Sequence, residues 1–337
     1  MNKPNRRVLV VGTGYHSQLF GPASTPLTNW SRLLERAAEH CGIKALSTRE
    51  RDGPMEWERL VTALVERRGR TGQAHVAESE LRKAVQAVLS NELRETEQKK
   101  GGDRRAISKF WRGIEDRITQ GGLHLVSLNF DCTHPGHGRL IFGGPKLRRS
   151  GARRGLRQSD VENLYRRRRL VSKAGAVSSI WHPHGIISCR NSLRLGFRDY
   201  GLAPASYAFA FSSFKAWQRS ILGIARNKTE GITQEEYSVL LQHLEQMDRS
   251  TNPRIKKADH WIARFMLLPV DIVGVGLSRE EFSLRWLLVQ RRRNSLRMAN
   301  PPPIRLHRTV QGEDLGEMAE IVRHPSHDEA WNIALRE

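Results

Sequence analysis

The sequence predicts an α/β fold in which helices flank a mainly parallel sheet and a helical insertion interrupts the strand–helix alternation. Short apolar runs without polar alternation recur along the 337 residues, as is typical of strands buried on both faces. Amphipathic helical segments separate these runs, and the first run ends in a glycine turn. Strands that alternate with helices in this way form parallel sheets covered by helices.

In the first third of the chain, the pattern predicts one strand and several helices. The strand covers residues 7–12 (RVLVVG), where four apolar residues follow one another. A helix is expected over 30–41, with Asn29 or Thr28 as its cap and Gly42 at its end. Residues from about 55 to 120 are charged, with apolar positions at helical spacing, and are interpreted as a helical insertion covering the sheet. Glycines at 69–72 and 101–102 break it into pieces.

The rest of the chain again alternates between strand-like and helical residue patterns. A helical region is expected over 215–249, with Thr233 as a cap three positions before Glu236. Another amphipathic helix begins at Ser278, and a last helix is expected over about 313–323. The predicted strands are 123–128, 177–182, 269–276 and a short one at 304–307. The whole chain, 1–337, is interpreted as a single domain.

Composition limits the class of protein. No apolar stretch approaches the roughly 20 residues of a membrane span, and the start of the chain lacks an apolar signal region. A cytoplasmic protein without membrane contact is therefore expected. Cys41, Cys132 and Cys189 form no CxxC pair, which argues against a disulfide framework and a structural zinc site. No bound metal is expected.

The charge is strongly positive, with 56 Lys and Arg against 35 Asp and Glu. Between Lys146 and Arg169 there are ten basic residues and two acidic ones, ending in the run Arg166 to Arg169. We interpret residues from about 145 to 170 as a basic loop. Such a loop favours nucleic acid or an acidic protein surface as a partner. The alternative is a solvated loop without a partner.

Polar groups follow three of the predicted strands. Gly12-Thr13-Gly14 and Ser17 come after the first strand, where Rossmann-like sheets receive a nucleotide phosphate; a tight turn alone is the alternative. Asn129 and Asp131 follow another strand, where ligands bind or where the residues only cap a turn.

Histidines provide the third set of polar groups. His182 and His184 flank Pro183 in WHPHG, and each is either a functional base or a hydrogen-bonded structural residue. His307, His324 and His327 are expected on the surface.

Taken together, the order of these motifs resembles the sirtuin-like superfamily, particularly its prokaryotic branch that hydrolyses NAD in antiphage defence. The glycine turn with Ser17 is similar to the GAG-S motif of that branch. Asn129 to Asp131 match its T-N-x-D motif, and His184-Gly185 match its catalytic HG. The later similarities are Asp199-Tyr200, and the GxGLSxxE run containing Gly274, Gly276 and Ser278.

The resemblance implies a role for each matched residue. Asn129 would orient the nicotinamide ribose or the attacking water, and His184 would be the general base. Asp131 would hold the loop or a ribose hydroxyl. Gly12, Thr13, Gly14 and Ser17 would cradle the pyrophosphate, and Gly274, Gly276 and Ser278 would contact the adenosine side.

Two departures narrow the expected activity. The four zinc cysteines of deacylating sirtuins are missing, and GPASTPLTNW replaces the GIPxFR loop. The expected function is therefore an NAD glycohydrolase with NAD as substrate, and the implied partners are further copies of the chain, a HerA-type ATPase or an Argonaute-like protein. The alternatives are an NAD or ADP-ribose sensor or regulatory subunit that does not hydrolyse its ligand, and a basic nucleic-acid-binding module.

Overall fold

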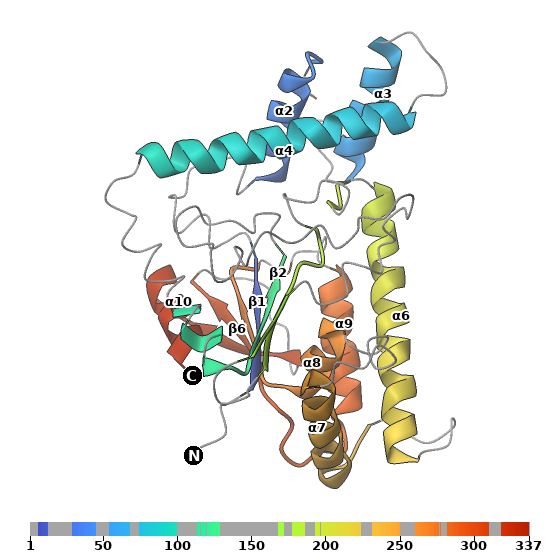
Figure 1. Ribbon diagram of the computed structural model, residues 1–337, viewed down its shortest axis with the longest axis vertical. Coiled ribbons are helices and arrows are strands. Elements are labelled where there is room, and N and C mark those ends of the chain that lie inside the picture. The colour runs from blue at the N-terminus through green and yellow to red at the C-terminus, as the bar shows by residue number, and fades with distance from the viewer. Residues whose placement is uncertain are drawn as a thin grey trace.

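A seven-stranded sheet forms the centre of the molecule (Figure 1). The computed structural model describes residues 6–12, 29–44, 54–67, 74–99, 113–114, 116–118, 120–128, 168–171, 177–185, 193–195, 197–223, 231–249, 260–275, 277, 282–309 and 318–336. The strands are β1 (Arg7–Val11), β2 (Leu123–Ser127), β3 (Arg168–Val171), β4 (Val177–Trp181), β5 (Val270–Val273), β6 (Ile304–Arg308) and β7 (Glu320–Arg323).

The sheet has the topology of a Rossmann fold. Its order is β3-β4-β2-β1-β5-β6-β7, and every neighbouring pair is parallel except β3 and β4. If β3 is set aside, the parallel strands stand in the order 3-2-1-4-5-6 of dinucleotide-binding sheets. β1 is central because its five residues, all buried, pair with β2 on one side and β5 on the other. The prediction of a mainly parallel, Rossmann-like α/β fold is confirmed.

Helices cover both faces of the sheet (Figure 1). On one face, Val8, Val10 and Trp181 belong to a large apolar core with residues of the helices on that side. These helices are α6 (Phe197–Leu222), α7 (Gln234–Arg249), α8 (Trp261–Leu267) and α9 (Phe282–Asn294). On the other face, Leu9 and Val11 pack in a smaller core with Trp331 of α10 (His327–Arg336).

Three further helices form a cap with its own core. These are α2 (Trp30–His40), α3 (Pro54–Arg67) and α4 (Ala74–Lys99), and they pack around Leu34, Trp57 and Leu81. In Figure 1 the cap lies beyond the carboxyl ends of the strands, with α4 crossing above them. Within the predicted insertion, α3 and α4 are helices that end just before the glycine breaks, which themselves lie outside the described residues.

The predicted helix boundaries have a visible chemical basis. Asn29 caps α2, because its side chain accepts a hydrogen bond of 3.0 Å from the Arg32 backbone N–H. Gly42, with φ +67°, follows the end of the same helix. Thr233 and Glu236 form a reciprocal capping box at the start of α7, with bonds of 2.9 and 3.3 Å.

Three predictions about secondary structure are wrong. A last helix was expected over about 313–323, but Glu320–Arg323 form strand β7, which pairs with β6, and α10 follows it at His327; residues 313–317 lie outside the described part of the chain. Arg168 and Arg169, assigned to the basic loop, begin the edge strand β3. The helical region expected from 215 is two helices, α6 beginning at Phe197 and α7 at Gln234, and α8 was not predicted. The strands β3 and β7 are short and charged and are defined by their pairing with β4 and β6, so their own residue pattern did not indicate a strand.

A buried ion cluster holds α7 and α8 against the sheet. Asp248 of α7 forms ion pairs with Arg264 of α8 and with Arg6, and lies 3.7 Å from His124 of β2. The guanidinium of Arg264, fully buried, also lies 5.5 Å from the centre of the Trp181 ring. One carboxylate therefore pairs with two arginines and lies beside a histidine, which come from three different parts of the chain.

His260 makes the start of α8 sensitive to acid. Its Nδ1 accepts a hydrogen bond of 3.3 Å from the Ala263 N–H, and its ring is buried. Burial, and then the positive charge of Arg264, lower the pKa of His260 to about 3.

We expect acid to destabilise the protein through His260. The folded state keeps the ring neutral, whereas the unfolded chain binds a proton below about pH 6.5. Stability is therefore intact above that pH and falls by about 1.4 kcal/mol per unit as the pH drops toward 3. Urea unfolding at pH 7 and pH 5 measures this. His260→Asn, which keeps a capping side chain without titrating, should lose about 2 kcal/mol less over that interval. Equal losses in both proteins would refute the assignment.

Candidate functional site

The predicted site lies at the carboxyl edge of the sheet, below the cap. Among its described members, Gly12 follows β1, His184 follows β4 and Gly274 follows β5. Strands β2 and β4 lie on one side of β1, whereas β5, β6 and β7 lie on the other. The connections thus change direction between β1 and β5, and dinucleotides bind in the crevice at such a switch point.

Gly12 and Gly274 are in close contact at this switch point. The Gly12 N–H donates a 3.0 Å hydrogen bond to the Val273 carbonyl. A Cβ added to Gly12 would lie 2.4 Å from the Gly274 oxygen and 2.8 Å from Cγ2 of Val275. Gly274 itself has φ +66°, which disfavours any side chain. The two glycines, predicted from separate motifs, therefore form one tight junction of backbone.

Gly12→Ala should break this junction. The added methyl group meets backbone rather than a flexible side chain, so we expect a loss of about 1–3 kcal/mol and weaker nucleotide binding. Chemical denaturation and NAD titration would measure the two effects. Gly223→Ala is the control, because its Cβ meets nothing within 4 Å although φ is +62°. The Gly223 variant should lose about 1 kcal/mol of stability and bind NAD as the wild type does. If the Gly12 variant had wild-type stability and binding, Gly12 would not be packed as tightly as described.

His184 occupies a tight turn directly after β4. The turn is closed by a 3.0 Å hydrogen bond from the Gly185 N–H to the His182 carbonyl, and Gly185 has φ +90°. Burial, followed by the charge of Arg194, lowers the pKa of His184 to about 4, while a hydrogen bond with the Leu128 backbone opposes the shift. The imidazole is therefore neutral at pH 7, and it contacts the residue that immediately precedes Asn129.

The His184 turn is also connected to the cap. The Arg194 N–H donates a 3.0 Å hydrogen bond to the His184 carbonyl. The neighbouring Leu193 and Leu195 are buried in the core of the cap, and Arg82 of α4 donates to the Leu193 carbonyl. A change in the position of the cap would consequently be transmitted to His184 through a single short segment.

His182 differs from His184 in its surroundings. It is 2% exposed, whereas His184 is half-buried. This difference supports a structural role for His182 and leaves His184 as the histidine accessible to a ligand.

The remaining predicted site residues lie outside the described residues. This applies to Thr13, Gly14, Ser17, Asn129, Asp131, Gly276 and Ser278, and to the basic loop before Arg168. Asp199-Tyr200 lie in the first turn of α6, with only their backbone described. The structure thus brings Gly12 and Gly274 together and places His184 at the same edge of the sheet, two strands away from β1, and the roles assigned to all of these residues stay predictions.

Some buried polar residues were missed or misplaced by sequence reasoning. Arg194 is 2% exposed beside His184 and was not singled out. His307 and His324 were expected on the surface, but they are 3% and 6% exposed. These two predictions are wrong because His307 lies in β6, an inner strand of the sheet, and its ring contacts Asp271 on one side and His324 on the other. The available signal was the single polar residue in the apolar strand VDIV, which is Asp271, the partner of His307.

No group of three or more His, Cys, Asp or Glu residues able to hold a metal occurs among the described residues. None of the described helices combines the length and apolarity needed to cross a membrane.

The sequence matches no family model, and no curated protein or solved structure is significantly similar to it. The function is accordingly inferred from the geometry at the carboxyl edge of the sheet and from the order of the motifs.

Proposed function

We propose that the protein is a sirtuin-like NAD glycohydrolase that cleaves the bond between nicotinamide and ribose. One observation carries the proposal: Gly12 and Gly274, distant in sequence, meet at the switch point of a sheet with Rossmann strand order, and His184 follows β4 at the same edge of that sheet. Dinucleotides bind at such switch points, and these residues belong to the motifs that resemble the NAD-cleaving branch.

The proposed reaction is a hydrolysis with a cationic transition state. The C1′–N bond breaks heterolytically, its electrons return to the pyridine ring, and neutral nicotinamide departs. Water adds to the oxocarbenium carbon and loses a proton to His184, so that ADP-ribose is the second product. Asn129 would hold the water or the ribose hydroxyls through its amide. Gly12, with Thr13, Gly14 and Ser17, would present backbone N–H groups to the pyrophosphate.

The environment of His184 suits this role once the nucleotide is bound. A neutral ring accepts a proton, and the negative charge of the bound pyrophosphate would raise the low pKa of His184. The cap, held to the His184 turn through Leu193 and Arg194, would shield the crevice from bulk water. In a cell such an enzyme would deplete NAD, as an antiphage effector does. It would be activated by forming oligomers or by binding an ATPase or an Argonaute-like protein, and such a partner would act on the cap.

A sensor that binds NAD or ADP-ribose without cleaving it is the second candidate. The pKa of about 4 favours it, because a weak base abstracts protons poorly at neutral pH. The same crevice and glycine junction would serve both functions.

A turnover experiment separates these candidates. Purified protein is incubated with NAD, and nicotinamide and ADP-ribose are quantified by chromatography, while calorimetry measures binding. Equimolar release of both products supports the hydrolase. Saturable binding without release, with or without added nucleic acid as activator, supports the sensor. If neither NAD nor ADP-ribose binds, both candidates fail.

A further inference from the structure

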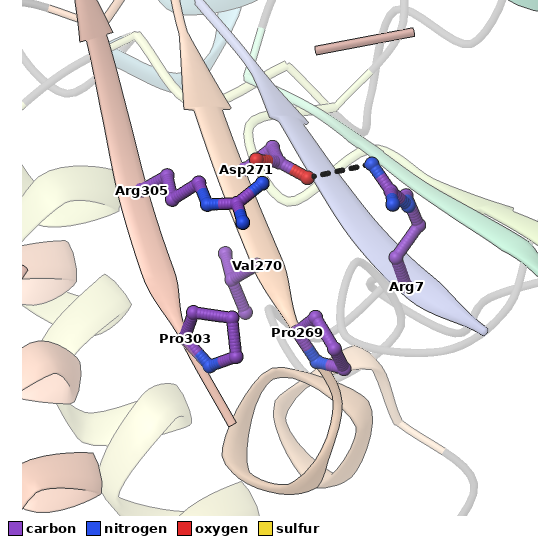
Figure 2. Close-up of a pocket in the computed structure, with 6 residues that line it drawn as sticks. All are labelled: Arg7, Pro269, Val270, Asp271, Pro303 and Arg305. Atoms are coloured by element: carbon purple, nitrogen blue, oxygen red, sulfur yellow. Dashed lines mark hydrogen bonds and ion pairs between the residues drawn. The ribbon is translucent and has the colours of Figure 1, made fainter. Parts of the chain in front are cut away.

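We propose that a second pocket, at the opposite edge of the sheet, binds a small tetrahedral oxyanion such as a phosphate group. The pocket has a volume of about 90 Å³ and opens at the amino ends of β1, β5 and β6 (Figure 2). Its lining residues are Arg7, Pro269, Val270, Asp271, Pro303 and Arg305. It is separated from Gly12 and His184 by the length of the strands, and it does not depend on the proposed function.

The carboxylate in the pocket is already neutralised. Asp271 accepts a 3.1 Å bond from Nη1 of Arg7 on one oxygen and lies 3.0 Å from Nε2 of His307 on the other. His307 is in turn hydrogen-bonded to His324 at 2.9 Å. Both oxygens of Asp271 are therefore already bound by protein groups.

The cations exceed the buried carboxylate. Arg7 is 6% exposed, and burial lowers its pKa despite Asp271, with Arg117 and Arg305 lowering it further. These guanidinium groups lie close enough to repel one another. Arg305 pairs with Glu320 at 3.7 Å, and that carboxylate is 65% exposed, so this pair is weakened by solvent. An anion in the pocket would relieve this repulsion.

Arg7, which lines the pocket, has an unsatisfied donor. Its Nε is buried and has no hydrogen-bond partner among the described residues, so the guanidinium must shift to present this N–H to an anion in the pocket. Leaving a charged donor unsatisfied costs more than leaving a neutral one, so a site with an acceptor is favoured. Figure 2 shows the guanidinium of Arg305 extending from the neighbouring strand toward Asp271 and Arg7.

The dimensions and lining restrict the ligand class. About 90 Å³ corresponds to the space of roughly three water molecules, which holds one tetrahedral oxyanion but not a nucleoside. Planar guanidinium groups bind phosphate oxygens through paired hydrogen bonds. Pro269 and Pro303 form the remaining walls and offer no backbone N–H. The ligand is therefore free phosphate or the terminal phosphate of a larger molecule that extends into solvent.

Calorimetric titration with inorganic phosphate, without NAD and at constant ionic strength, tests the proposal. We expect saturable binding of one phosphate per chain that Arg305→Gln weakens about tenfold or more. The control is Arg323→Gln, which removes the same charge from an exposed side chain of the adjacent β7 and should change the affinity less than about twofold. Because NAD is absent, the result is independent of whether the chain cleaves NAD.

A second titration with ADP identifies the source of the phosphate. Arg305-dependent competition by ADP assigns the pocket to a nucleotide phosphate, and lack of competition assigns it to free phosphate. The proposal is overturned if the wild-type chain binds no phosphate. It is equally overturned if both arginine variants lose affinity alike, since general attraction to a chain of net charge +21 would then explain the binding.

Discussion

Replacing His184 with alanine should reduce nicotinamide release from NAD by about 100-fold or more, because removing a general base typically costs 10²–10⁴ in rate. The side chain is half-buried at the edge of the crevice, so its loss removes little packing. Release should be measured at saturating NAD, and circular dichroism would establish that the variant is folded. Asn129→Ala should have an effect of similar size.

His182→Ala is the matched control for this experiment. His182 is the neighbouring histidine in the same turn, but it is buried. Its variant should lose stability yet retain more activity per folded molecule than the His184 variant. If His184→Ala turns over NAD at nearly the wild-type rate, the catalytic assignment is wrong, whatever the behaviour of His182.

Asp248→Ala should lower the free energy of unfolding by about 3–5 kcal/mol. The substitution leaves Arg264 buried without its carboxylate and also removes the partner of Arg6. Urea unfolding at pH 7, followed by far-UV circular dichroism, gives the difference directly.

Glu245→Ala provides the comparison on the same helix. Glu245 pairs with Arg249 at 2.6 Å, but this pair lies on the surface, so its loss should cost less than about 1 kcal/mol. Similar losses in the two variants would show that the buried cluster does not hold α7 and α8 to the sheet.

The parts of the fold that could be predicted are those with a local signal. The runs RVLVV and VDIV contain consecutive apolar residues because both faces of the sheet are covered, and they are strands. Thr233 and Glu236 lie at capping-box spacing and form that box. By contrast, RRLV and EIVR are short and charged, and they became strands through pairing with β4 and β6.

In the candidate site, too, only the parts with a local signal in the sequence could be predicted. Glycines that follow buried strands indicate a turn at the carboxyl edge, and Gly12 and Gly274 lie there. Nothing in the sequence indicates that Arg194 approaches His184, or that Asp271 joins Arg7 to His307. Those contacts depend on strand order and register, which only tertiary pairing determines.

The central position of β1 has a consequence for biosynthesis. Val8 pairs with His124 on one side and with Val270 on the other, so the second edge of β1 lacks a partner until the segment around residue 273 has left the ribosome. Contacts between such distant parts of the chain form slowly. Meanwhile an apolar strand edge is open to other chains and able to aggregate. Expression at lower temperature, which slows synthesis and weakens apolar association, should therefore raise the yield of folded protein.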